Sequence, residues 1–148
     1  MEPQSRILRE KRGAFVTLKI GGMLRGCIGM IRAAQPLYLT IFEMAQAAAF
    51  EDPRFMPITE KELTDIEIEI SVLSPLVRVE NIDEIKVGRD GLMILLNQHS
   101  GLLLPQVATE HGWDKTTFLE QTCLKAGIPK NSYKDKSAEI YRFSAEIF

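Results

Sequence analysis

The sequence predicts one domain built from both strands and helices, and two periodicities carry this prediction. Residues 66–73 alternate apolar and polar side chains, as a strand with one buried face does. Within residues 36–50, Leu37, Ile41 and Ala48 recur at helical spacing and indicate an amphipathic helix. The chain has 148 residues and is 45% apolar, which fits a single domain with a core that needs no disulfides.

The N-terminal part of the chain predicts a short basic stub, residues 1–12, followed by a β-hairpin. Residues 14–20 are rich in β-branched and aromatic side chains, which favour strands. Two glycines follow, and glycine accepts the positive φ of a tight turn. We expect the return strand at residues 24–32, where simple alternation places Arg25 and Cys27 on the same face.

The central segment predicts a helix and a capped turn before the alternating strand. A proline suits the first turn of the helix at 36–50, and Asp52-Pro53 ends it because a residue before proline avoids the α region. Thr59 with Glu62 three residues later is typical of a capping box. A short helical turn is therefore expected directly before the strand.

The C-terminal half predicts a second hairpin, two helices and a closing strand. Asp114 is a good N-cap, Gly127 a good helix stop, and Cys123 falls on the apolar face between them. The expected elements are strands at 92–96, 101–104 and 139–145 and helices at 105–110 and 114–126.

Composition excludes several classes of protein. The net charge of −2 does not favour nucleic-acid binding through phosphate neutralisation, although it does not exclude a local basic patch. The apolar runs are far shorter than the roughly 20 residues of a membrane-spanning helix. The start lacks the apolar core of a signal peptide, and two distant cysteines fit neither a zinc site nor a disulfide framework. We therefore expect a cytoplasmic protein.

Cys27 is the candidate nucleophile. It lies between two glycines, which let a ligand or another backbone come close, and Arg25 could stabilise a thiolate. The alternative is a buried, inert thiol, because free cysteine is among the most buried residue types. No base lies nearby in sequence, so both interpretations stay open.

Carboxylates and arginines supply further candidates, each with a structural alternative. Asp52 and Arg54 flank a proline and either bind an anion or form a local pair that fixes the turn. Arg89 and Asp90 have the same two interpretations. Glu69, with a second glutamate two residues earlier, is a candidate acid or base, although a solvated strand face also explains this pattern.

Eight ordered segments make the chain similar to a known family, the AMMECR-type domain. They are L-R-G-C-I-G (24–29), A-A-F-E-D-P-R-F (48–55), I-E-I-S-V-L-S-P (68–75), G-R-D-G-L (88–92), L-L-L-P-Q-V-A (102–108), G-W-D (112–114), F-L (118–119) and K-A-G-I-P (125–129). The resemblance covers residues 13–148.

The resemblance implies an α+β fold with a mixed, barrel-like sheet, flanking helices, a duplicated unit of three strands and two helices, and two lobes around a cleft. It also implies a functional site. Its catalytic candidates are Cys27, Asp52 and Glu69, and its ligand-binding candidates are Arg25, Gly26, Gly29, Arg54, Ser71, Arg89, Asp90 and Gln106, with Trp113 as a further member. No cofactor is implied, and the ligand is expected to be small and polar or anionic.

Two functions of different classes follow from this resemblance. The first is an enzyme with Cys27 as nucleophile, acting in a pathway with Memo-type and radical S-adenosylmethionine proteins. The second is a non-catalytic scaffold that presents a metabolite or RNA to a partner enzyme. Family members usually carry a longer N-terminal region, so we also expect uncovered apolar surface and a symmetric dimer near residues 14–31.

Overall fold

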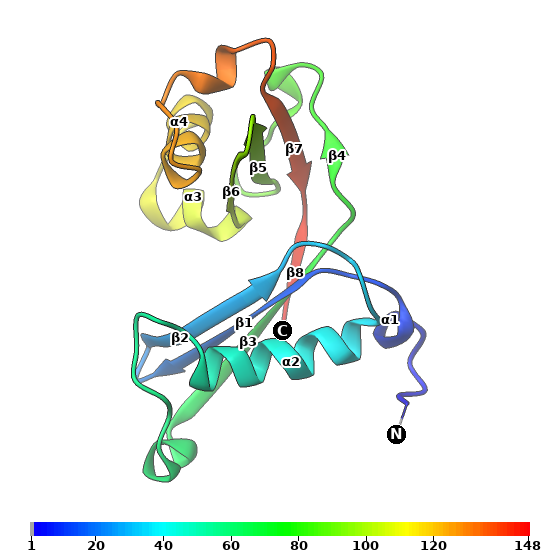
Figure 1. Cartoon of the computed structure of the whole chain (residues 1–148), viewed down its shortest axis with the longest axis vertical. Coiled ribbons are helices and arrows are strands. Elements are labelled where there is room, and N and C mark those ends of the chain that lie inside the picture. Colours follow the sequence, from blue (N-terminus) through cyan, green and yellow to red (C-terminus); the bar gives the residue numbers. More distant parts are fainter. Residues whose placement is uncertain (1) are drawn as a thin grey trace. The chain divides into compact units, whose positions relative to one another are not determined.

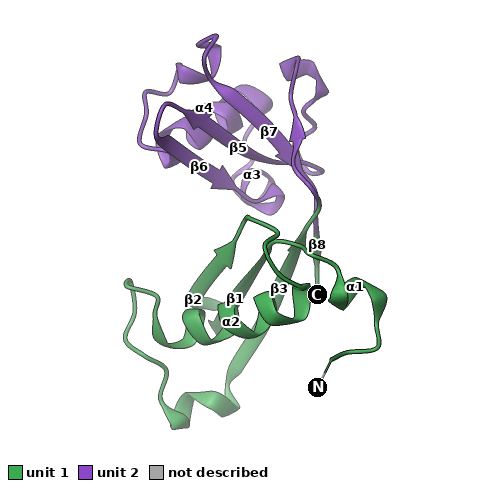
Figure 2. Ribbon diagram, turned by 45° about the vertical axis from the view of Figure 1, so that its right-hand side comes forward, with its two compact units in different colours: residues 1–74, 146–148 green, residues 75–145 purple. Residues whose placement is uncertain are grey.

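The computed structural model describes residues 2–148. The chain divides into two compact units (Figure 2). Unit 1 comprises the chain up to residue 74 together with residues 146–148, and unit 2 comprises residues 75–145. Each unit holds one four-stranded antiparallel sheet and two α-helices, which confirms the α+β class.

Unit 1 is a sheet with a long helix packed across one face (Figure 1). Its strands run in the order β2-β1-β3-β8, with α2 covering the sheet and α1 beside it. The core between α2 and the sheet contains Val16, Leu18 and Ala48. The elements are α1 (Arg6–Arg9), β1 (Ala14–Ile20), β2 (Met23–Met30), α2 (Leu37–Phe50), a 3-10 turn η1 (Glu60–Thr64), β3 (Ile66–Leu73) and β8 (Ala145–Ile147).

Unit 2 repeats this plan with two helices on its sheet. Its strands run in the order β4-β7-β5-β6. Leu92, Ile94 and Phe118 lie at the centre of its core and are almost completely buried. The elements are β4 (Val77–Arg78), η2 (Ile82–Glu84), β5 (Gly91–Leu96), β6 (His99–Leu103), α3 (Pro105–His111), α4 (Lys115–Lys125), η3 (Ser132–Lys134) and β7 (Glu139–Phe143).

The two units share one topology, which confirms the predicted duplication. In each, a hairpin is followed by a helix and then by a strand that pairs with the first hairpin strand: β3 with β1, and β7 with β5. In each sheet the edge strand comes from the far side of a chain crossing, because β4 follows β3 in sequence but pairs with β7, and β8 follows β7 but joins β3. The helices differ in order, since α1 precedes its hairpin.

The sheets are separate and open rather than barrel-like. In residues 2–148 the strands form no closed barrel, because β2 and β6 each pair on one side only. Pairing along both sheets is antiparallel, so the expectation of a mixed sheet is corrected. No helix in the same residues is both long and apolar enough to cross a bilayer.

Candidate functional site

Cys27 lies in the middle of the edge strand β2, opposite Thr17 on β1. Its Sγ is 3.2 Å from the Thr17 hydroxyl oxygen, Oγ1. Thr17 is in turn opposite Glu69 on β3. Because neighbouring strands place opposite residues on one face, Cys27, Thr17 and Glu69 form a row across three strands. This row is on the face turned away from α2, since Val16 and Leu18 face the helix.

The turn after α2 closes around the main chain of Cys27. One carboxylate oxygen of Asp52 accepts the Cys27 N–H at 3.0 Å, and the other accepts the Arg54 N–H at 3.1 Å. The Arg54 guanidinium donates to both oxygens and, at 3.4 Å, to the Cys27 carbonyl. The turn therefore satisfies the edge-strand groups that a further strand would otherwise pair.

The Asp52 carboxylate is ionised and buried. Its side chain is 1% exposed. The hydrogen bond from the Arg54 side chain, supported by N–H donors of Cys27 and Arg54, holds its pKa well below the usual range despite burial. The predicted Asp52–Arg54 pair therefore fixes the turn.

Arg25 departs from the predicted arrangement. The pairing register shifts by one between Leu18 and Lys19, so β2 carries Arg25 as an extra residue. Simple alternation does not hold across such a bulge, and the prediction that Arg25 shares the Cys27 face is therefore corrected. Its guanidinium instead binds Glu62 in η1, at 2.7 and 3.1 Å, and the Pro57 carbonyl at 3.3 Å.

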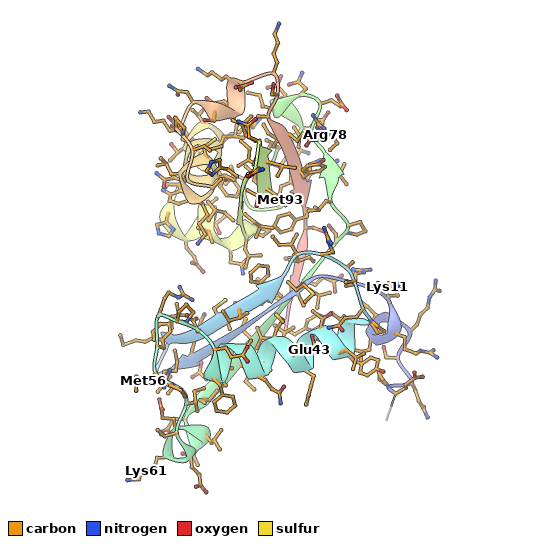
Figure 3. The ribbon with its side chains drawn as sticks, viewed as in Figure 1. Lys11, Glu43, Met56, Lys61, Arg78 and Met93 are labelled. Atoms are coloured by element: carbon orange, nitrogen blue, oxygen red, sulfur yellow. The ribbon has the colours of Figure 1, made fainter. Side chains whose placement is uncertain are left out.

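Glu62 binds both Thr59 and Arg25 at the η1 end of unit 1. It forms the predicted capping box with Thr59, whose N–H and hydroxyl it accepts. Its carboxylate also accepts hydrogen bonds from the Arg25 guanidinium. This interaction is the main reason that the pKa of Glu62 falls to about 2. Lys61, beside Glu62, is labelled in Figure 3 and marks this end of the unit.

Arg25 and Arg54 both approach the ring of Phe55. Their guanidinium carbons lie 6.0 and 5.4 Å from the ring centroid, within the range of a cation–π contact. Each guanidinium already carries a carboxylate partner. The Arg54 side chain is nevertheless 56% exposed, so part of its charge stays open to solvent.

Three other candidate positions in unit 1 have packing explanations. A Cβ on Gly26 would strike the Ala48 carbonyl of α2, so glycine lets helix and strand approach closely. A Cβ on Gly29 would strike the Phe15 ring. Ser71 lies opposite Phe15 on β3 and is buried. Their role in ligand binding stays a prediction.

The remaining candidates belong to unit 2. Asp90 is buried and accepts the Arg89 guanidinium and the Lys86 N–H. Burial raises its pKa, but these hydrogen bonds outweigh burial and leave it below the usual value. Gln106 lies in the first turn of α3, and Trp113 stacks on His111 with ring centroids 4.6 Å apart. Their role in a common site, and the cleft itself, stay predictions.

Sequence reasoning missed Thr17, Phe55 and the second role of Glu62. Counting back from the two-glycine turn pairs Thr17 with Gly26, one residue from its real partner, because the bulge at Arg25 has no clear signature in sequence. Phe55 lies within a motif that carries the family resemblance, but no local pattern links it to two arginines. The described residues hold no cluster of three His, Cys, Asp or Glu side chains suited to a metal ion.

Comparisons with known proteins identify the family. The AMMECR1 family profile matches residues 1–148. A protein of Thermococcus onnurineus is 50% identical over 95% of this chain and 74% of its own length. One of Methanothermobacter thermautotrophicus is 47% identical over 96% and 77%. The crystal structure of an uncharacterized Pyrococcus horikoshii protein, 41% identical, superposes with a TM-score of 0.91 over 99% of this chain and 79% of that one. The chain therefore belongs to the AMMECR1 family.

Proposed function

We propose that the protein uses Cys27 as a reactive thiol toward a small polar or anionic substrate. The contact of 3.2 Å between Sγ and the Thr17 hydroxyl carries the proposal. The Asp52–Arg54 turn binds both main-chain groups of Cys27, so the thiol is held in place while the residue stays partly exposed. A fixed and accessible thiol is what nucleophilic catalysis requires.

Each residue around the thiol has a distinct role in this proposal. Sulfur attacks an electrophilic carbon as the thiolate, so the thiol proton has to leave. Glu69 is the carboxylate next in the row, 3.4 Å from the Lys19 ammonium, and we assign it as the acceptor of that proton, while the Thr17 hydroxyl donates to the thiolate. The exposed part of the Arg54 guanidinium attracts an anionic group of the substrate.

Alkylation by iodoacetamide tests the proposal, with the second cysteine as an internal control. Cys123 is fully buried and burial raises its pKa, so it should react slowly in the native protein. We expect Cys27 to be alkylated at least about tenfold faster, measured by peptide mass spectrometry between pH 6 and 9. A Cys27 that reacts only after denaturation would show an inert structural thiol.

A matched pair of threonine variants tests the role of the hydroxyl. Thr17→Val keeps the shape of the side chain and removes its hydrogen bond, so alkylation of Cys27 should slow several-fold. Thr116→Val makes the same change at an exposed position of α4 and should have no effect. Equal rates in both variants would remove Thr17 from the mechanism.

An exposed apolar row on α2 favours the second candidate function, a scaffold. Leu39, Phe42 and Phe50 lie on the outer face of the helix and are exposed. Such a surface suits a protein partner, and the Memo-type and radical S-adenosylmethionine proteins remain the predicted partners. Under this alternative Phe42→Gln abolishes co-purification with such a partner, whereas Cys27→Ser preserves it and all function.

A further inference from the structure

Unit 1 contains an apolar cavity at the α1 end of α2, away from the turn that holds Cys27. Its volume is about 300 Å³. In Figure 3, Lys11 marks the α1 end of α2 and Met56 the opposite end, next to Phe55. The cavity is lined by Ile7 and Leu8 of α1, Leu37 and Ile41 of α2, and Ile70 and Val72 of β3.

The cavity has the properties of a binding site for a hydrocarbon. Leu37 and Val72 are almost fully buried and form its floor, while Phe148, which is largely exposed, lies at its edge. Pockets for small ligands begin at about 300 Å³, and apolar cavities of about half that size stay dry and take up benzene or xenon. Water gains no partners there, so an apolar group is the favoured occupant.

The segment that contributes Ile7 and Leu8 to this apolar space is basic. Arg6 precedes Ile7 and Arg9 follows Leu8, and both arginines are exposed. Within residues 2–148, Arg6 forms its ion pair with Glu10, at 3.7 Å, and that carboxylate is shared with Arg12. The partner of Arg9 is the neutral Gln4 carbonyl, at 3.4 Å. Residues 6–12 contain four basic side chains and one acidic one, so the segment beside the cavity carries a net positive charge.

We propose that this cavity binds the tail of an amphipathic anion, a medium-chain fatty acid, with its carboxylate toward Arg6 and Arg9. The apolar lining accounts for the tail and the basic segment for the head group. The site is independent of Cys27, because it uses the other end of α2 and none of the residues around the thiol.

Isothermal titration calorimetry with decanoic acid and its methyl ester tests both parts of the proposal. We expect saturable binding of the acid, and weaker binding of the uncharged ester. Ile41→Phe fills the cavity and should weaken the binding of both probes at least tenfold. The matched control is Ile68→Phe, at an exposed position on the same strand as Ile70, and it should bind like the wild type. Thermal unfolding checks that each variant folds, and Ile70→Phe provides a second filled cavity if Ile41→Phe does not.

The double variant Arg6→Glu with Arg9→Glu tests the charge. It should weaken binding of the acid about two- to fivefold, as exposed ion pairs are worth up to about 1 kcal/mol, and leave the ester unchanged. Arg78→Glu, on β4 of unit 2, is the matched control and should change neither. The proposal is overturned by an absence of saturable binding, or by binding that neither filling variant weakens. Acid binding that the double variant leaves at the wild-type affinity would overturn the anionic part.

Discussion

At the scale of single residues, Asp52 fixes the position of the Cys27 main chain. Its two oxygens bind the Cys27 N–H and the N–H and side chain of Arg54, so one carboxylate links strand β2 to the turn after α2. A buried carboxylate with this many donors is costly to alter, because each lost partner leaves another polar group unpaired.

We predict that Asp52→Asn lowers the free energy of unfolding by about 1–2 kcal/mol at pH 7 and lets the thiol of Cys27 move away from Thr17. An amide keeps one acceptor but loses the charge and turns a donor toward either an N–H or Arg54. Urea denaturation measures the loss. Asp65→Asn, at an exposed position, is the control and should change stability by less than about 0.5 kcal/mol.

The pH dependence of the same pair has a definite sign. The pKa of Asp52 is lower in the folded protein than the value of about 3.9 expected for an unfolded chain. Its stabilisation is therefore complete above about pH 4 and lost as the pH falls through the folded-state pKa. The stability difference between wild type and Asp52→Asn should shrink below pH 4, and a constant difference down to pH 2 would refute this assignment.

The sequence predicted the local contacts of this site but not the contacts between residues far apart in the chain. Asp52 and Arg54 are two residues apart, so their pairing could be proposed from sequence alone. The hydrogen bond from the Cys27 N–H to Asp52 joins residues 25 positions apart. It forms because β2 is an edge strand, which leaves this N–H free of a strand partner. The bulge at Arg25 decides which side chains face Cys27, and no local pattern encodes it.

At the scale of elements, both units bring a helix unusually close to the second strand of a hairpin. In unit 1 this contact lies between Gly26 and Ala48, and in unit 2 it lies between Gly101 and Ala126. In both places an added Cβ would meet backbone atoms, which cannot move aside as a flexible side chain can.

We predict that Gly26→Ala and Gly101→Ala each destabilise the protein by about 1–3 kcal/mol, because the helix must move away from its sheet. Differential scanning calorimetry would record the change. Ser100→Ala, exposed and next to Gly101, is the control for an alanine substitution in the same strand and should stay within about 0.5 kcal/mol of the wild type. Wild-type stability in either glycine variant would show that the helices can shift freely.

The longer elements were predicted correctly because their periodicity is local. Strands β1 and β3 and helices α2 and α4 agree with prediction to within a few residues. The short β4 was missed, and β7 and β8 were expected as one strand at 139–145. Strands of two or three residues carry too little pattern, and their partners in the sheet define them.

At the scale of the whole molecule, the pairing of β8 with β3 makes the stability of unit 1 depend on the C-terminal end of the chain. Ile70 on β3 exchanges two hydrogen bonds with Phe148, at 2.9 and 3.1 Å, although the two residues are 78 positions apart in the sequence. Without these bonds the edge of β3 is unpaired in the described structure. The predicted dimer near residues 14–31 stays a prediction that sedimentation at micromolar concentration would check.

We predict that the fragment 1–74 is stabilised by adding the fragment 75–148, which supplies β8. The fragment 75–144 lacks β8 and is the matched control, so it should give little stabilisation. Circular dichroism during thermal unfolding of each mixture measures the effect. Equal stabilisation by both C-terminal fragments would show that β8 contributes nothing.

The pairing of β4 with β7 and of β8 with β3 also bears on the ancestry of the fold. Two copies of a half-length chain that swapped their last strands, and were later joined by gene fusion, would produce this connectivity, because each copy would complete the sheet of its twin. Residues 1–78 alone, carrying β1 to β4, should then pair as a swapped homodimer in sedimentation equilibrium. A folded monomer of that length would instead favour an origin in which the second half was added to a self-sufficient first half.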